Sequence, residues 1–309
     1  MKVIYGKSAL ELENIPPSTV TVGTFDGIHK GHMALLERLI KAAAENNTIS
    51  IMATFDPHPQ MMLGQRGQTE ILNTNEEKLE RLEKLNLDIV VVLDFNRQLA
   101  SLDAESFIKR ILLDCLNMKR FVVGYDHSFG KNRSGNIKLV KSLADDYNYT
   151  FEMVGPVHNG DQPIKSSRIR KELKTGDYNK AVEMLGYNYF LTGEIIRGMG
   201  VGKKLGYPTI NINIPSGKLL PKDGVYAAMV HVDNRIIPGM AYIGGRLTFG
   251  DETINVEVNL FDFSEDILGK KVKLTLEQYT RDPKKFESSE ELIAALAEDK
   301  KQIKNILHI

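Results

Sequence analysis

The first half of the chain alternates short apolar runs with amphipathic stretches. The apolar runs have the length and composition of buried strands and lie at residues 18–25, 48–55, 87–95, 120–126 and 150–157. The stretches between them space apolar residues three and four positions apart, as helices do, and lie at residues 32–46, 75–86, 105–117 and 137–147. This alternation predicts an α/β domain, with a doubly wound, Rossmann-like parallel sheet. Within it, Leu79, Leu82 and Leu85 alternate with Glu and Lys, which predicts a surface helix.

From about Tyr187 the pattern changes to short strand-like runs separated by Gly, Pro, Asn and Asp. These runs lie at residues 190–198, 224–233, 235–245, 253–263 and 270–280. A helical pattern returns only at residues 288–307. Short, regularly spaced strands predict an antiparallel β-barrel closed by a C-terminal helix. We therefore expect two domains, 1–186 and 187–309, with the boundary near Gly186.

Composition narrows the class of protein. The 309 residues are 42% hydrophobic and 26% charged, and 40 basic residues balance 40 acidic ones. Zero net charge argues against a partner bound by bulk electrostatics, whether nucleic acid or membrane. No apolar run has spanning length and the N-terminus lacks the core of a signal peptide, so we expect a cytoplasmic protein. The single Cys115 is expected to be a buried, inert thiol.

The first candidate site is the stretch from Gly23 to His32, which follows the first long apolar run. His29 and His32 stand where a helix begins, next to glycines that allow close approach of a ligand. Two interpretations are open: ordinary polar residues at a helix start, or hydrogen-bond donors to a phosphate at a helix N-terminus.

A second stretch favours the phosphate. Ser166 and Ser167 open a predicted helix, with Arg168 and Arg170 just behind them. Hydroxyls, helix N–H groups and guanidinium groups together form a phosphate cradle, although this stretch alone is also typical of a capped, solvated helix.

The second half carries weaker signals of its own. A glycine-rich connection is followed by Gly206-Tyr207-Pro208-Thr209-Ile210-Asn211, and such loops can wrap phosphates with backbone N–H groups. Glu257 alternates with Val256 and Val258, so by pattern alone it is an exposed residue on a half-buried strand.

Taken in order along the chain, these motifs resemble the bacterial bifunctional riboflavin kinase/FAD synthetases. The resemblance extends over nearly the whole chain and rests on the stretches at residues 23–32, 54–59, 122–136, 164–170 and 206–211. It implies that the first domain transfers AMP from ATP to FMN, giving FAD, and that the second phosphorylates riboflavin to FMN. It also implies Mg²⁺ as cofactor, ATP as co-substrate, and riboflavin, FMN and FAD as substrates and products.

The resemblance assigns roles residue by residue. His29 and His32 would stabilise the α-phosphate, and Glu257 would be the base that accepts the riboflavin 5′-hydroxyl proton. Residues implied to bind ATP phosphates are Gly23, Phe25, Ser166, Ser167, Arg168, Arg170, Gly198, Gly200, Gly202 and Lys203. Residues implied to hold Mg²⁺ are Thr209 and Asn211. Residues implied on the flavin side are His58, Asp126 and Arg281, although His58 and Asp126 are equally typical of turn-forming residues.

The chain departs from the family pattern at several positions. Lys165 replaces an Ile before the two serines, and His127 stands where an aromatic or apolar residue is common. Departures in the second half are Val201, Tyr242, Leu247 and Asn259. They leave open a monofunctional FAD synthetase with a degenerate, flavin-binding barrel. Another H-x-G-H transferase and a non-catalytic flavin sensor are further alternatives, and oligomerisation is possible.

Overall fold

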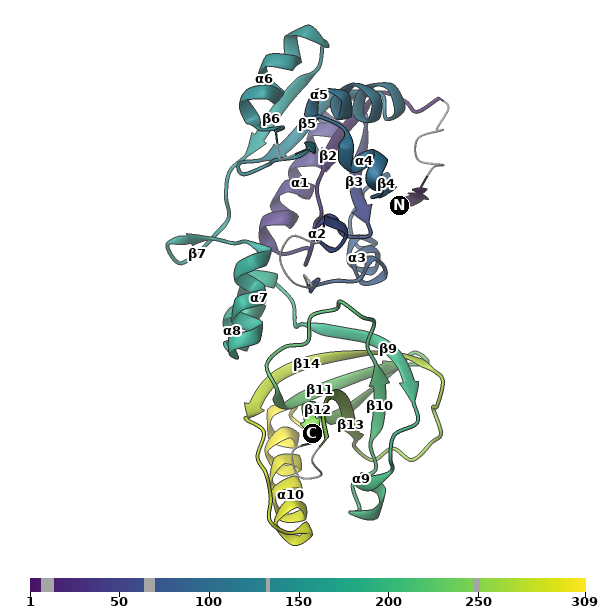
Figure 1. Cartoon of the computed structure of the whole chain (residues 1–309), viewed down its shortest axis with the longest axis vertical. Helices are drawn as coiled ribbons and strands as arrows, with labels where there is room; N and C mark the ends of the chain where they lie inside the picture. The colour runs from purple at the N-terminus through teal and green to yellow at the C-terminus, as the bar shows by residue number, and fades with distance from the viewer. Residues whose placement is uncertain (7–13, 64–69, 132–133, 247–250) are drawn as a thin grey trace. The chain divides into compact units, whose positions relative to one another are not determined.

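The computed structural model describes residues 1–6, 14–63, 70–131, 134–246 and 251–309 (Figure 1). The chain divides into two compact units, Met1–Ser166 and Ser167–Ile309. We describe each unit by itself.

The first unit is built on a six-stranded sheet in the order β1-β4-β3-β2-β5-β6, in which every strand pair is parallel. The strands are β1 (Lys2–Tyr5), β2 (Ser18–Val22), β3 (Ile49–Asp56), β4 (Ile89–Asp94), β5 (Met118–Gly124) and β6 (Thr150–Val154). The helices are α1 (Lys30–Glu45), α2 (Pro59–Leu63), α3 (Asn75–Leu82), α4 (Arg97–Ser101), α5 (Ala104–Phe107), the π-helix η2 (Ile108–Cys115) and α6 (Ile137–Asp146). A hairpin of β7 (His158–Asn159) and β8 (Gln162–Pro163) follows. This architecture confirms the predicted doubly wound sheet.

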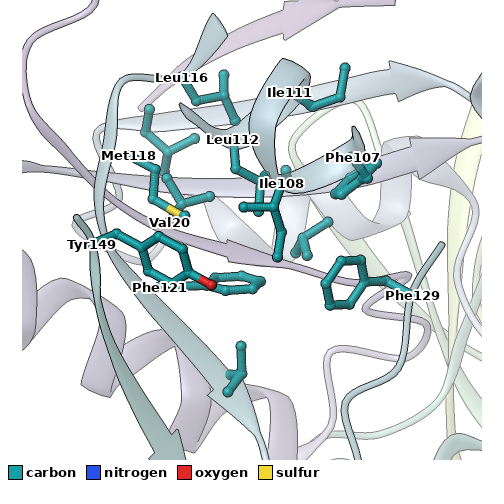
Figure 2. Packing of buried hydrophobic residues seen from close by; sticks show 14 of the residues in the cluster. Val20, Phe107, Ile108, Ile111, Leu112, Leu116, Met118, Phe121, Phe129 and Tyr149 are labelled. Carbon is teal, nitrogen blue, oxygen red and sulfur yellow. The ribbon is translucent and has the colours of Figure 1, made fainter. Parts of the chain in front are cut away.

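Alternate residues of the central strands serve two separate cores. Leu36 of α1 belongs to a cluster with Met52 and Val122, while Phe121 points to the opposite face and belongs to a cluster with η2 and α6 (Figure 2). All these side chains are buried. Burial on both faces is why these strands appear in the sequence as continuous apolar runs.

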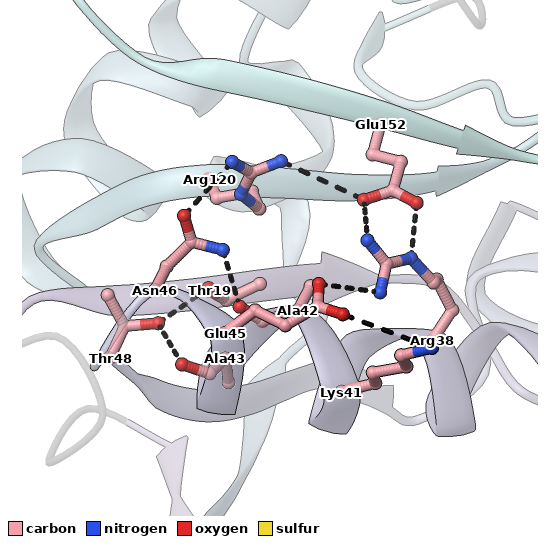
Figure 3. Close-up of polar contacts among 10 residues, drawn as sticks. All are labelled: Thr19, Arg38, Lys41, Ala42, Ala43, Glu45, Asn46, Thr48, Arg120 and Glu152. Carbon is pink, nitrogen blue, oxygen red and sulfur yellow. Dashed lines mark hydrogen bonds and ion pairs between the residues drawn. The ribbon is translucent and has the colours of Figure 1, made fainter.

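An ion network ties α1 to the edge of the sheet (Figure 3). The guanidinium of Arg38 binds both carboxylate oxygens of Glu152 on β6, through Nε and, at 2.7 Å, through Nη2. Its Nη1 also donates to Glu45 at 3.0 Å. The hydrogen bonds that Arg38 donates to Glu152 are the largest cause of the raised pKa of Arg38.

We expect Glu152→Gln to lower the free energy of unfolding of the first unit by about 1 kcal/mol, the upper end for half-exposed pairs. The charge of the paired carboxylate is lost while the side chain keeps its shape. Glu45→Gln is the matched control, and its more exposed carboxylate should contribute less. Calorimetry of the full chain measures both variants, and equal effects would contradict the assignment.

The second unit is a closed barrel in the order β10-β13-β12-β11-β14-β9, with all pairs antiparallel. Its strands are β9 (Phe190–Ile196), β10 (Ile210–Asn213), β11 (Gly224–Val232), β12 (Arg235–Arg246), β13 (Asp251–Leu260) and β14 (Lys271–Arg281). Its helices are α7 (Ser166–Thr175), α8 (Tyr178–Leu185), the short α9 (Val201–Lys204) and the C-terminal α10 (Ser289–Ile306), which packs against β11, β12 and β14 (Figure 1). The predicted barrel and closing helix are confirmed.

Helices α7 and α8 pack with the barrel. The Tyr178 hydroxyl donates to the carbonyl of Leu276 on β14, and the Lys222 N–H donates to the carbonyl of Leu173 at 2.8 Å. Helix α8 ends at Gly186, whose φ of +79° is a left-handed cap. The functional boundary expected at this glycine lies later in the chain than the division between compact units, and it stays a prediction.

Three local features differ from the sequence expectations. Helix α3 is not a simple surface helix, because Glu77 and Lys78 are buried. Residues 108–115 form a π-helix, and Cys115 on it is half-exposed instead of buried, with a thiol that donates to the Arg110 carbonyl.

Within the described ranges, no helix combines the length and the apolar character needed to cross a membrane.

Candidate active sites

Residues 23–32, called the histidine turn below, lie at the point where the strand order of the parallel sheet reverses. The chain leaves β2 for β3 on one side, and β5 pairs with β2 on the other side. Residues 23–29 follow the carboxyl end of β2, and Tyr125 and Asp126 follow the carboxyl end of β5. Open α/β sheets bind ligands at this kind of switch point.

His29 is the N-cap of α1. Its Nδ1 accepts a hydrogen bond from the backbone N–H of His32 at 3.3 Å, and the side chain is buried. The two imidazole rings stack, with centroids 3.6 Å apart and 16° between their planes. Because Nδ1 is the acceptor, the neutral ring of His29 carries its proton on Nε2. The cap and the phosphate-donor interpretations of the sequence are therefore compatible.

Burial and neighbouring charge disfavour protonation of His32. The pKa of His32 lies well below its usual value because of burial first, then the proximity of His29 and Lys78. The Nδ1 of His32 is buried and has no hydrogen-bond partner within the described part of the chain, so a second ring proton would be left unsatisfied there. A neutral imidazole can still donate one hydrogen bond to a phosphate oxygen.

The turn itself has a strained backbone. Phe25 and Ile28 have positive φ values of 47° and 35°. Such conformations cost about 1–3 kcal/mol each in non-glycine residues and persist only where the surroundings hold them. The Phe25 ring packs against His32 at 5.2 Å, and a Cβ at Gly23 would meet that ring at 3.2 Å.

Asp26 anchors this turn at two sides. Its carboxylate accepts the backbone N–H groups of Leu72 and Asn73 at 2.8 and 3.1 Å. Its backbone carbonyl accepts the hydroxyl of Ser166 at 2.8 Å. The structure thus brings one of the predicted serines to the histidine turn. The other three residues predicted from the same stretch to bind phosphate, Ser167, Arg168 and Arg170, lie on α7 in the second unit, and their role stays a prediction.

Two residues predicted on the flavin side have structural partners. Asp126 is exposed and forms an ion pair with Lys165 at 3.2 Å, so the unusual lysine before the serines has a counter-charge. The Nδ1 of His58 accepts the Gln60 N–H at 3.2 Å, as a turn residue does. At His127, the other departure in the first half, burial lowers the pKa to about 4. Flavin binding by Asp126 and His58 stays a prediction.

The second site is a cavity of about 170 Å³ in the barrel unit. Among the predicted site residues, Gly202, Thr209, Glu257 and Arg281 line it. Its apolar lining, here called the apolar wall, includes Val225, Met240, Phe286, Leu292 and Leu296, the last two from α10. Barrel closure and the C-terminal helix therefore enclose the face of β13 that carries Glu257.

Thr209 contacts Glu257, and Asn211 lies opposite Glu257 on the neighbouring strand. The hydroxyl of Thr209 donates to Glu257 Oε2 at 3.3 Å, and Asn211 of β10 lies opposite Glu257 in the β10–β13 register. Asn211 is buried and Glu257 is half-buried. A carboxylate and a hydroxyl thus line the cavity, and a buried side-chain amide stands opposite the carboxylate residue in the sheet.

The glycine-rich loop passes very close to these groups. A Cβ at Gly198 would lie 2.1 Å from Asn211 Nδ2, and one at Gly202 would lie 2.3 Å from the Tyr207 carbonyl oxygen. Gly200 caps the short helix α9, which also carries the exposed Lys203.

Gly198→Ala is expected to lower the riboflavin phosphorylation implied by the resemblance at least tenfold, because the new methyl group must displace Asn211. Gly200→Ala is the matched control, since its Cβ has no atom within 4 Å and only the left-handed φ of +70° opposes it, at a cost of about 1 kcal/mol. Steady-state assays of both variants test this, and equal activities would contradict a tight role for Asn211.

The departures from the family pattern are accommodated in the barrel. The Tyr242 hydroxyl donates to the Gly245 carbonyl at 2.7 Å, and Asn259 Nδ2 donates to the Pro208 carbonyl at 2.7 Å. Val201 lines the cavity with both of these residues. Leu247 lies outside the described residues. Asn259 therefore fixes the Pro208-Thr209 backbone rather than leaving the site incomplete.

Arg281 is oriented by a partner that the sequence did not reveal. Its Nε and Nη2 bind the two carboxylate oxygens of Asp299 on α10 at 2.8 and 2.7 Å, and Asp299 is 5% exposed. These bonds are the first cause of the raised pKa of Arg281. Lys78, Asp26 and the apolar wall were missed as well. The pattern of the helices that carry Asp299 and Lys78 did not single out either residue.

The two folds and their sites define a class: a nucleotidyltransferase-type α/β unit followed by a barrel with a kinase-type site. The sequence model of the FAD synthetase family matches residues 12–168, and that of the riboflavin kinase family matches residues 185–307. The chain belongs to the family of bifunctional riboflavin kinase/FMN adenylyltransferases.

Individual relatives agree with this membership. A bifunctional riboflavin kinase/FMN adenylyltransferase of Listeria monocytogenes is 33% identical over 91% of this chain and 89% of the relative. Its counterpart in Buchnera aphidicola of Schizaphis graminum is 32% identical with 100% of both chains covered. A crystal structure described as a macrolide-efflux protein from Streptococcus pneumoniae has a TM-score of 0.88, with 30% identity and 99% of both chains covered.

Proposed function

We propose that this chain makes FMN in the barrel unit and converts FMN to FAD in the α/β unit, with ATP as co-substrate in both reactions. The observation that carries the proposal is that one chain holds both the histidine turn at the sheet switch point and Glu257 in the barrel cavity. Its relatives are named for both activities, and this chain matches them over nearly their full length.

In adenylyl transfer, a phosphate oxygen of FMN attacks the α-phosphorus of ATP, and the bond to the β-phosphate oxygen breaks to release pyrophosphate. FMN is itself the nucleophile, so the protein needs only to position substrates and stabilise charge. His29 Nε2–H and the neutral imidazole of His32 supply donors for the α-phosphate oxygens. Ser167, Arg168 and Arg170 hold the β- and γ-phosphates in this proposal.

In riboflavin phosphorylation, the 5′-hydroxyl oxygen attacks the γ-phosphorus of ATP, and ADP leaves. Glu257 accepts the hydroxyl proton. The apolar wall of the cavity suits the isoalloxazine ring, and the Asp299-held guanidinium of Arg281 faces the same cavity. Gly198, Gly200, Gly202 and Lys203 surround the ATP phosphates in this proposal.

Mg²⁺ fits the donor set at the second site. The Thr209 hydroxyl and the Asn211 side-chain carbonyl are the hard oxygen ligands that this ion prefers, and both belong to the group around Glu257. When bound with ATP, the ion would offset phosphate charge.

The monofunctional alternative is not favoured. A degenerate barrel would have no need to keep the Thr209 hydroxyl on Glu257 at 3.3 Å beside a cavity, and the riboflavin kinase family model matches residues 185–307. We further propose that the reactions take place in the cytoplasm and that residues 1–186 and 187–309 are the functional domains.

Phosphate labelling tests the assignment of each reaction. With riboflavin as acceptor, label from the γ-phosphate of ATP should enter FMN and then FAD, while label from the α-phosphate should enter FAD alone. Label from the α-phosphate in FAD made from added FMN, with none from the γ-phosphate in any flavin, would instead support the monofunctional alternative.

A further inference from the structure

Lys78 is a buried cation beneath the histidine turn. It lies on α3, it is 5% exposed, and its Nζ donates to the Thr24 carbonyl at 2.8 Å and to Thr54 Oγ1 at 3.0 Å. The Thr54 hydroxyl in turn donates to the same carbonyl at 3.2 Å. An ammonium group and a hydroxyl thus converge on one backbone oxygen.

That carbonyl belongs to the peptide unit that enters Phe25, the first strained residue of the turn. Asp26, one residue further, receives the two N–H groups of the segment that leads into α3. Helix α3 and the segment before it therefore hydrogen-bond to the turn at Thr24 and at Asp26, on either side of Phe25. His29 lies four residues after Phe25 in the same turn, and the hydrogen bond that its Nδ1 accepts from the His32 N–H sets the position of His32.

The charges around Lys78 are identified. Burial lowers its pKa to about 8, against the carboxylates of Asp26 on the turn and Asp56 at the end of β3, which raise it. The groups that face His32 are His29 and Lys78, and both lower its pKa. Lys78 is too enclosed to reach a phosphate itself, so its effect passes through the turn and through the field at His32.

We propose that Lys78 is a positioning residue for FMN adenylylation, holding the strained turn so that both histidines face the ATP phosphates. Its positive charge also disfavours protonation of His32. The inference rests on the proposed adenylyl transfer in the first unit.

The test compares Lys78→Met with wild type and with Lys84→Met, the same change at an exposed lysine just beyond α3. The pH profile of kcat/KM for ATP is measured with saturating FMN. We expect Lys78→Met to lower kcat at least tenfold and to move the acid limb of the profile to higher pH, because loss of a nearby cation raises the pKa of His32. The ionisation of ATP is the same in every assay, so a difference between variants in the acid limb of the pH profile arises from a group on the protein.

Riboflavin phosphorylation by the same preparations reports whether the chain is folded and competent elsewhere, and we expect it to be unchanged. A normal rate in Lys78→Met, or a lowered rate with an unmoved acid limb, would overturn the proposal. Wild type that forms no FAD from FMN would instead overturn the proposed function itself.

Thr54→Val provides a second variant should Lys78→Met fail to fold. It removes one hydrogen bond to the Thr24 carbonyl and one to Lys78, but no charge. We expect a severalfold loss of kcat with the acid limb in place, and an unchanged kcat would contradict the role of this network in holding the turn.

Discussion

His29→Asn should lower the rate of FAD formation from FMN by about 10²–10³-fold, the usual effect of removing one preorganised donor to a developing oxyanion. Asparagine is among the best N-cap residues, so it can replace the bond that His29 Nδ1 accepts from the His32 N–H. The variant therefore removes the imidazole while it preserves the start of α1. The measurement is the single-turnover rate of FAD formation with saturating MgATP.

The control is riboflavin phosphorylation by the same variant, which should stay within about twofold of wild type because the barrel is a separate compact unit. His29→Ala loses the cap as well, and its additional effect on stability measures that structural part alone. An equal loss of both reactions in His29→Asn would contradict the assignment of this histidine to one site.

Glu257→Gln should show the converse pattern, with FMN formation slowed by about 10²–10⁴-fold and adenylyl transfer retained. Glutamine keeps the length of the side chain and an oxygen that can accept the Thr209 hydroxyl, so the cavity keeps its shape. It cannot accept the proton of the 5′-hydroxyl. The initial rate of FMN formation from riboflavin measures the effect.

Glu194→Gln is the matched control for this change, because Glu194 is an exposed glutamate on β9 of the same barrel. It should leave both rates unaltered. A rate of riboflavin phosphorylation by Glu257→Gln equal to that of wild type would exclude this carboxylate as the base.

The local pattern of apolar and polar residues was sufficient to predict much of the fold and the position of the histidine turn. Continuous apolar runs arise from strands buried on both faces, and Phe121 and Val122 point into opposite cores as that pattern requires. The histidines are three positions apart at a helix start, so their proximity is a local property of the chain. The cap bond and ring stacking follow from that spacing.

Long-range packing decided what the pattern could not predict. The spacing of Leu79, Leu82 and Leu85 suggested that Lys78 faced water, yet its acceptors come from the turn after β2 and from β3. Glu257 had the periodicity of a solvent-facing residue, and only barrel closure and α10 place it in a cavity. The Arg281–Asp299 pair likewise joins β14 to α10 across a helix packing contact.

The most direct test of two activities in one chain is to incubate the pure protein with riboflavin, ATP and Mg²⁺ and to separate the flavins by chromatography over time. The account predicts that FMN appears first and that FAD then accumulates at its expense. A protein that leaves riboflavin unchanged, or that stops at FMN with ATP still in excess, would contradict it.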